Sequence, residues 1–204
     1  MNELERKFAE YGLVDVGAMD PFIAVDMKYS TTDNFMGQNM YGELRTAWLV
    51  PEMVEKVVAV QHRLRTRRPG FSLVIFDAAR PISVQRMMFA AVAGTPDNIY
   101  VANPDKRGGG YHNYGLAVDV SILDDKREPL DMGSAFDHFG AESHVGFEKQ
   151  LLTAGFITQA AYNNRTLLYS LTSAEGLKPH PKEWWHYQPF YDQERKRTYR
   201  LLDF

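Results

Sequence analysis

The chain has 204 residues, of which 45% are hydrophobic and 24% charged, and its formal net charge is −3. This balance is ordinary for a globular protein with a sizeable core, and the length predicts one domain over residues 1–204. The weak negative charge gives no support to nucleic-acid binding, because the arginine runs at 63–68 and 195–200 are short and fit a solvated surface. The absence of cysteine excludes disulfides, thiolate metal ligands and a cysteine nucleophile.

No apolar run is long enough to cross a membrane, and residues 1–12 are charged and amphipathic, unlike a signal peptide. We therefore expect no membrane insertion. The expected location is the cytoplasm, or the periplasm if an export signal has been removed from the chain. Nothing in the composition or motifs indicates an oligomeric state.

Helical and strand patterns alternate in the first half of the chain. Pro51 suits the first turn of a helix, and apolar side chains recur after it at helical spacing. The apolar run after Gly70 is typical of a short buried strand. We predict helices over residues 2–11 and 51–65, and strands over residues 13–16, 22–27 and 72–76.

The second half is less regular and begins with a long loop over residues 96–110 that ends in three glycines. Helices and strands are mixed without a regular β-α-β alternation, and no repeat or linker divides the chain. This pattern predicts an α+β fold in a single domain, with a central, mostly antiparallel sheet flanked by helices. The predicted elements are helices over 82–92, 147–153 and 165–174, and strands or extended segments over 115–122, 155–160 and 179–189.

Residues 111–120 combine a histidine, a glycine and an aspartate with a strand pattern. Alternate residues of the strand are apolar and require a core, whereas small residues on the other face leave space above Asp119. His112 lies an odd number of positions before Asp119, so the two side chains converge only if the chain turns, which Gly115 allows. Taken alone, the pair fits a surface hydrogen bond as well as a metal pair.

A second motif, Glu183-Trp184-Trp185-His186, lies far downstream. His186 would complete a His/Asp/His set, and three protein ligands are the number that a catalytic zinc takes. Glu183 could then accept a proton from the water at the metal. The side chains of Glu183 and His186 lie on the same face if this segment is a helix. In a strand they share a face only if the strand contains a bulge, and the sequence leaves both possibilities open. In the alternative interpretation, the tryptophans fill the core and the flanking residues lie at the surface.

A third motif, Asp77-Ala78-Ala79-Arg80-Pro81, lies between a predicted buried strand and a helix start. Asp77 can hold the Arg80 guanidinium by paired hydrogen bonds, and an arginine so fixed can stabilise the oxyanion of amide hydrolysis. A structural salt bridge is the alternative. Of the other histidines, His62 and His180 fit surface or core-edge positions.

Together these motifs resemble the zinc D-alanyl-D-alanine dipeptidases of the vancomycin-resistance type, within the D-Ala-D-Ala metallopeptidase family that also includes peptidoglycan carboxypeptidases. The resemblance covers roughly residues 13–190, in the family's order. It rests on Asp26-Met27-Lys28-Tyr29, Asp33-Asn34-Phe35, Asp77-x-x-Arg80-Pro81, Tyr111-His112-x-x-Gly115-x-Ala117-x-Asp119, Met132-Gly133-Ser134 with Phe136-Asp137, and Glu183-x-x-His186.

The resemblance implies one Zn²⁺ per chain, in a cleft on the sheet. His112, Asp119 and His186 match the family's zinc ligands. Glu183 matches the general base and acid.

The resemblance also implies a substrate site. Arg80 matches the residue that stabilises the tetrahedral intermediate, with Asp77 as its support. Tyr29 and Asp137 match substrate-binding positions, and Asp137 would meet the free ammonium of a dipeptide. One departure is Gly110, which stands where the family has a substrate-binding serine. A backbone N–H there is the alternative donor.

The sequence therefore predicts a zinc-dependent dipeptidase that hydrolyses D-Ala-D-Ala or related small dipeptides and is linked to peptidoglycan metabolism. One alternative is a peptidoglycan D,D- or L,D-carboxypeptidase or endopeptidase, but an ammonium site at Asp137 favours free dipeptides. Another is a non-catalytic zinc-containing domain that binds cell-wall peptides. The presence of both Glu183 and Arg80 favours an enzyme over such a domain.

Overall fold

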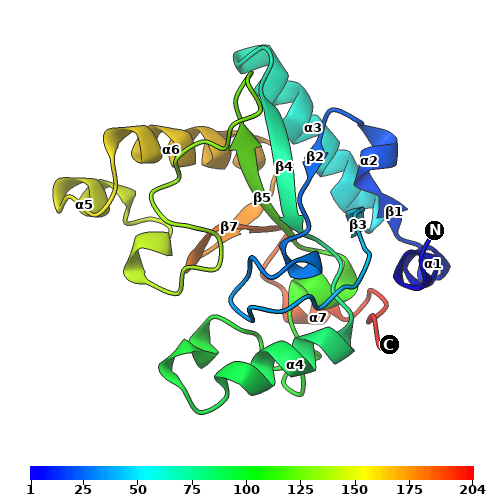
Figure 1. The fold of residues 1–204 in the computed structure, drawn as a ribbon. Coiled ribbons are helices and arrows are strands. Elements are labelled where there is room, and N and C mark those ends of the chain that lie inside the picture. The colour runs from blue at the N-terminus through cyan, green and yellow to red at the C-terminus, as the bar shows by residue number, and fades with distance from the viewer.

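A five-stranded sheet forms the centre of the computed structural model, which describes all residues 1–204 (Figure 1). The strand order is β2-β4-β5-β7-β6, with β2 parallel to β4 and the other neighbours antiparallel. The predicted α+β class with a mostly antiparallel sheet is confirmed. The elements are α1 (Glu3–Glu10), β1 (Val14–Asp15), α2 (Val16–Met19), β2 (Ala24–Val25), β3 (Trp48–Leu49), α3 (Pro51–Arg67), β4 (Ser72–Asp77), α4 (Ile82–Val92), β5 (Val118–Leu123), α5 (Glu148–Thr153), α6 (Gln159–Ala174), β6 (Lys178–His180), β7 (Glu183–Gln188) and α7 (Gln193–Lys196), with short 3-10 helices including η1 (Lys28–Ser30) and η3 (Tyr111–Tyr114).

The central strands of the sheet are buried on both faces. Helices α3 and α6 pack against each other behind the sheet and cover one face of it (Figure 1). The residues of α3 that face this core recur at helical spacing, as the sequence predicts, and include Met53, Val57, Val60 and Leu64. Every residue of β4 and of β7 is buried, and the main core contains 42 residues. None of the helices has both the length and the apolar character that a membrane-spanning helix requires.

The N-terminal strands are shorter than predicted. β1 and β2 contain two residues each, and the four-residue helix α2 lies between them. Asp15 starts this helix, because its side chain accepts the N–H of Gly17. A helix of one turn is too short to produce a periodic pattern in the sequence, so the local cap decides its structure.

The prediction of an extended segment over residues 155–160 is wrong, because α6 already begins at Gln159. The Thr158 side chain accepts the N–H of Ala161 and caps the helix. The buried face of α6 includes Arg165, whose Nε donates to the carbonyl of Met132 at 2.6 Å. Because Arg165 occupies a core position, the apolar periodicity that would predict a helix is interrupted in the first turns of α6.

Candidate active site

Three side chains that could hold a metal ion come from separate elements and meet beside strands β5 and β7. His112 lies on η3, and Gly115 ends that helix with a left-handed backbone (φ +66°), so the chain turns sharply before β5. Asp119 on β5 and His186 on β7 are direct partners in the antiparallel pairing of these strands. The predicted turn therefore brings His112 over the strand that carries Asp119.

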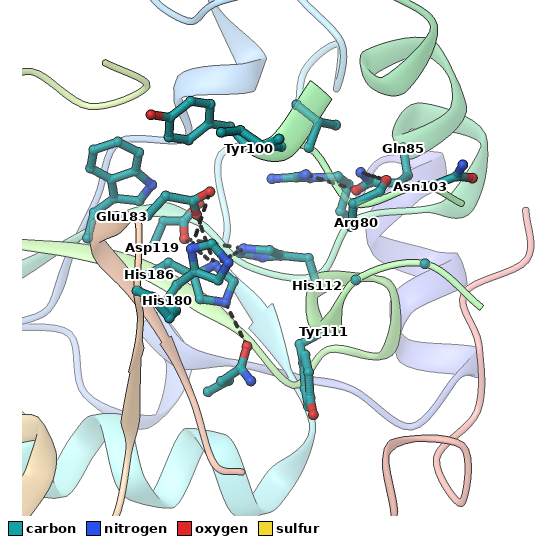
Figure 2. Close-up of a pocket in the computed structure, with 18 of the residues that line it drawn as sticks. Arg80, Gln85, Tyr100, Asn103, Tyr111, His112, Asp119, His180, Glu183 and His186 are labelled. Carbon is teal, nitrogen blue, oxygen red and sulfur yellow. Dashed lines mark hydrogen bonds and ion pairs between the residues drawn. The ribbon is translucent and has the colours of Figure 1, made fainter. Parts of the chain in front are cut away.

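The donor atoms of this group face one another at short range (Figure 2). Asp119 Oδ1 lies 3.2 Å from His112 Nε2 and 3.1 Å from His186 Nδ1. The two nitrogens are themselves 3.1 Å apart, and all three side chains are buried. The group has the compactness that coordination of a single ion requires.

Hydrogen bonds on the far side of each imidazole decide which atoms are free to bind a cation. His112 Nδ1 lies 2.6 Å from the carbonyl of Ala78, so it carries the proton and leaves a lone pair on Nε2. His186 Nε2 lies 3.1 Å from Gln188 Oε1, whose amide is oriented by a backbone carbonyl, so His186 Nδ1 is also an acceptor. Asp119 Oδ1 has no hydrogen-bond donor. Three acceptors thus converge, and a bound metal cation would satisfy all of them.

Glu183 faces the same cleft as His186, although three positions separate them on a strand. The pairing of β6 with β7 shifts in register near the start of β7, and this irregularity supplies the bulge that the sequence left open. Glu183 Oε2 lies 3.7 Å from His186 Nδ1. Burial, followed by the negative charges of Asp119 and Asp137, raises the pKa of Glu183 well above its usual value. The carboxylate therefore binds a proton readily, as a general base requires.

Arg80 follows β4 and is fixed by its neighbours. Its Nε and Nη2 donate to Asp77 Oδ2 at 3.1 and 2.6 Å, and its Nη1 donates to Gln85 Oε1 at 2.9 Å. Asp77 also accepts the hydroxyl of Tyr41, and the N–H of Arg80 donates to the carbonyl of His112. Burial alone would lower the pKa of Arg80, but the charge of Asp77 holds it well above its usual value. The guanidinium is an oriented, permanent cation.

Tyr29 and Asp137 lie together in the same cleft. The Tyr29 hydroxyl is 3.0 Å from each carboxylate oxygen of Asp137, and the N–H of Phe35 donates to Asp137 Oδ2 at 3.1 Å. Burial raises the pKa of Asp137 to about 7, against the lowering effect of the hydrogen bond from Phe35. The Arg80 guanidinium lies 5.1 Å from the centre of the Tyr29 ring, which places this pair beside the arginine.

The glycine loop over residues 108–110, directly before η3, forms one edge of the cleft. The N–H of Gly110 donates to Asn113 Oδ1 at 2.8 Å, so the backbone donor expected to replace the family's serine is already in use. Gly109 has a φ of +77°, and a Cβ on it would lie 2.4 Å from the same oxygen. Lys196 on α7 holds the loop from behind by donating to the carbonyls of Arg107 and Gly109. These contacts tie the loop to η3 and to α7.

The cleft that these groups line has a volume of about 540 Å³ and contains two further residues that sequence reasoning missed. His180 Nδ1 lies 3.6 Å from Glu183 Oε1, and burial lowers the pKa of His180 to about 3. Tyr100 comes from the loop over residues 96–110 and lies above Glu183 in Figure 2. No spacing in the sequence marks either residue, because tertiary contacts bring both into the cleft.

A potential cation site, a carboxyl group with high proton affinity and a fixed guanidinium thus share one cleft large enough for a small peptide. Metal-assisted hydrolysis of an amide uses an electrophilic cation, a proton acceptor and stabilisation of a developing oxyanion. The site therefore has the groups that a metal-dependent peptidase uses.

Comparison with known proteins identifies the family. The model of the family Peptidase_M15, described as D-ala-D-ala dipeptidase, matches residues 9–201, and the chain belongs to this family. A D-alanyl-D-alanine dipeptidase of Escherichia coli (strain K12) is 30% identical over 177 residues, which cover 86% of this chain and 83% of the relative. D-alanyl-D-alanine dipeptidases of Enterococcus faecium and Enterococcus faecalis (strain ATCC 700802 / V583) are 28% and 26% identical, over 79% and 88% of this chain and 83% and 92% of the relatives.

Proposed function

We propose that the protein is a zinc-dependent dipeptidase that hydrolyses D-Ala-D-Ala or a related small dipeptide in peptidoglycan metabolism. The observation that carries the proposal is the convergence of three buried acceptor atoms beside the carboxyl group of Glu183. Two imidazole nitrogens and one carboxylate oxygen are donors that zinc prefers, and a set of three leaves a coordination position open. His112, Asp119 and His186 would hold one ion per chain.

Each residue of the site has a separate role in hydrolysis. When bound, zinc supplies Lewis acidity, which makes water more acidic and a peptide carbonyl more electrophilic. Glu183 accepts a proton from the attacking water and returns it to the nitrogen of the departing amine. Arg80, oriented by Asp77, stabilises the negative charge that develops on the carbonyl oxygen. Asp137, supported by Tyr29, binds the ammonium group of the dipeptide.

The relatives and the shape of the site support a free dipeptide as the substrate. The relatives are named D-alanyl-D-alanine dipeptidases, and the matched family carries the same description. A carboxypeptidase acting on longer peptides would meet a neutral amide where Asp137 stands. A free amine would give the partly buried Asp137 carboxylate a charged hydrogen-bond donor that an amide cannot supply.

A panel of dipeptides of defined chirality, assayed with one equivalent of zinc, tests the proposal. We expect D-Ala-D-Ala to be hydrolysed and its N-acetylated form to be a poor substrate. The Glu183→Gln variant should retain zinc and lose about a thousandfold in kcat, since general-base catalysis of this kind is worth 10²–10⁴. Near-normal turnover by Glu183→Gln would remove this residue from the mechanism, and preferred hydrolysis of N-acetylated or longer peptides would overturn the dipeptidase proposal.

A further inference from the structure

Asn113 directly follows His112 on η3 and is completely buried. Its side-chain Oδ1 accepts the N–H of Gly110 at 2.8 Å, and its Nδ2 donates to the carbonyl of Arg80 at 2.9 Å. The carbonyl of Asn113 accepts the N–H of Leu202 at 2.8 Å. One residue therefore joins η3 to the glycine loop, to the segment that carries Arg80 and to the C-terminal segment.

The Arg80 backbone is bound to η3 on both of its sides. Its N–H donates to the carbonyl of His112 at 3.0 Å, and its carbonyl accepts Nδ2 of Asn113. The Asn113 amide is the only hydrogen-bond donor to that carbonyl, since no backbone N–H reaches it. A third bond joins the same two segments, because His112 Nδ1 lies 2.6 Å from the carbonyl of Ala78. Two consecutive residues of η3 thus hold the segment that ends at Arg80.

The contacts of the Arg80 guanidinium are local by comparison. Its partners Asp77 and Gln85 lie three positions before and five positions after it in the chain, so they orient the guanidinium within its own segment. The pairing of β4 with β5 ends at Asp77. Beyond that point, the bonds to η3 join Arg80 to the segment of His112, and both side chains line the same cleft (Figure 2).

We propose that Asn113 is a positioning residue, which fixes the Arg80 backbone against η3 and so sets the place of the guanidinium relative to the metal group, defined as His112, Asp119 and His186. This inference rests on the proposed function, in which Arg80 stabilises the oxyanion and the metal group holds zinc. Asn113 touches no reacting atom and acts through Arg80. Because a displacement of about 1 Å can cost about a hundredfold in rate, loss of the Asn113 amide should slow turnover more than it weakens substrate binding.

Two variants remove the amide in different ways. Asn113→Ala leaves a cavity, whereas Asn113→Leu keeps a branched side chain that fills the buried space. We expect each zinc-loaded variant to hydrolyse D-Ala-D-Ala with a kcat lower by about tenfold to a hundredfold, with KM changed by less than about threefold and one zinc still bound per chain. An unchanged kcat in both variants, or a loss of zinc that accounts for the lower rate, would overturn the inference.

A double-mutant cycle tests whether Asn113 acts through Arg80. The second background is Asp77→Asn/Arg80→Met, which lacks the guanidinium and leaves no buried charge of this ion pair without its partner. Asn113→Leu should change kcat/KM by less than about twofold in that background, because no guanidinium remains to be positioned. Equal losses in both backgrounds would overturn the inference, since Asn113 would then act independently of Arg80.

Hydrogen exchange separates this inference from the proposed function, because it needs neither zinc nor substrate. The measured quantity is the exchange rate of the Arg80 backbone N–H, followed by NMR on the metal-free protein. Asn113→Leu should raise this rate by at least about tenfold more than the rates of N–H groups inside α6, which report any general loss of stability. An equal rise at both places, or none, would overturn the positioning role.

Asn164→Leu is the matched control. Asn164 is a half-buried residue of α6 whose Nδ2 also donates to a backbone carbonyl, that of Asp131 at 2.8 Å, and it does not line the cleft. This variant should keep both kcat and the exchange rate of the Arg80 N–H. If the unmodified protein does not hydrolyse D-Ala-D-Ala, the proposed function fails, and the exchange rates alone decide whether Asn113 fixes Arg80.

Discussion

Replacing Asp77 by asparagine removes one charge from a buried ion pair and preserves the shape of the side chain. Asp77 is fully buried and Arg80 is 8% exposed, so water cannot replace the lost partner. Two N–H groups of Arg80 donate to Asp77 Oδ2, and an amide NH₂ in that position would face these donors with donors of its own. The hydroxyl of Tyr41 can still donate to the amide oxygen that replaces Oδ1.

The expected loss is large because the guanidinium stays buried without its counter-charge. Breaking a buried ion pair by removing one partner costs about 3–5 kcal/mol, a substantial part of the roughly 5–15 kcal/mol that stabilises a typical domain. We expect Asp77→Asn to lower the free energy of unfolding by about 3 kcal/mol, at the lower end because the amide oxygen retains one hydrogen bond. Urea unfolding of the metal-free protein, kept with a chelator, measures this difference without a contribution from metal binding.

Asp26→Asn provides the matched control. Asp26 pairs with Lys28 at 2.9 Å, but the aspartate side chain is 50% exposed, so its loss should cost less than about 1 kcal/mol. The double variant Asp77→Asn/Arg80→Met should be more stable than the sum of the two single losses predicts, because it leaves no buried charge unpaired. A cost below about 1 kcal/mol for Asp77→Asn would show that Arg80 does not depend on this carboxylate.

Three further predictions concern the metal group, the ammonium site and the glycine loop. His112→Ala should abolish stoichiometric zinc binding in elemental analysis, and an unchanged zinc content would exclude this ligand. The pKa of Asp137 is raised to about 7, so its carboxyl is neutral below that pH and cannot form an ion pair with an ammonium. The kcat/KM for D-Ala-D-Ala should therefore fall as the pH drops through about 7. Asp137→Asn should have a low kcat/KM, and the fall near pH 7 that titration of Asp137 causes should be missing from its pH profile. The same fall in the variant would contradict the assignment. Gly109→Ala should lower the free energy of unfolding by about 1–2 kcal/mol or more, because φ is +77° and the new Cβ would lie too close to Asn113 Oδ1. Urea unfolding measures this loss. A change below about 0.5 kcal/mol would show that the loop adapts to the new side chain.

The sequence predicts the parts of this site that depend on local backbone geometry. The alternating pattern around Asp119 defines a strand, and Gly115 marks the turn that brings His112 back over it. The relation between Glu183 and His186 could not be settled in the same way, because the bulge in β7 arises from its pairing with β6. Strand pairing is a tertiary property that a six-residue stretch does not specify.

Long-range contacts account for the features that the sequence conceals. Arg165 hides the buried face of α6, since its burial depends on the carbonyl of Met132, on a distant segment. Tyr100 gains its position through contacts with His144 and Phe139, which lie on distant segments of the chain. The unavailability of the Gly110 N–H likewise depends on the position of the Asn113 side chain, which residue type alone does not determine.

In the proposed function, a zinc ion held by His112, Asp119 and His186 supports the hydrolysis of a free dipeptide. The most direct measurement is the rate of D-Ala-D-Ala hydrolysis by chelator-treated protein as zinc is added back in known amounts. The rate should be negligible without metal and should reach its maximum at one equivalent of zinc per chain. Hydrolysis that persists after the metal has been removed, or no hydrolysis when one equivalent of zinc is bound, would show that this zinc ion does not support the reaction.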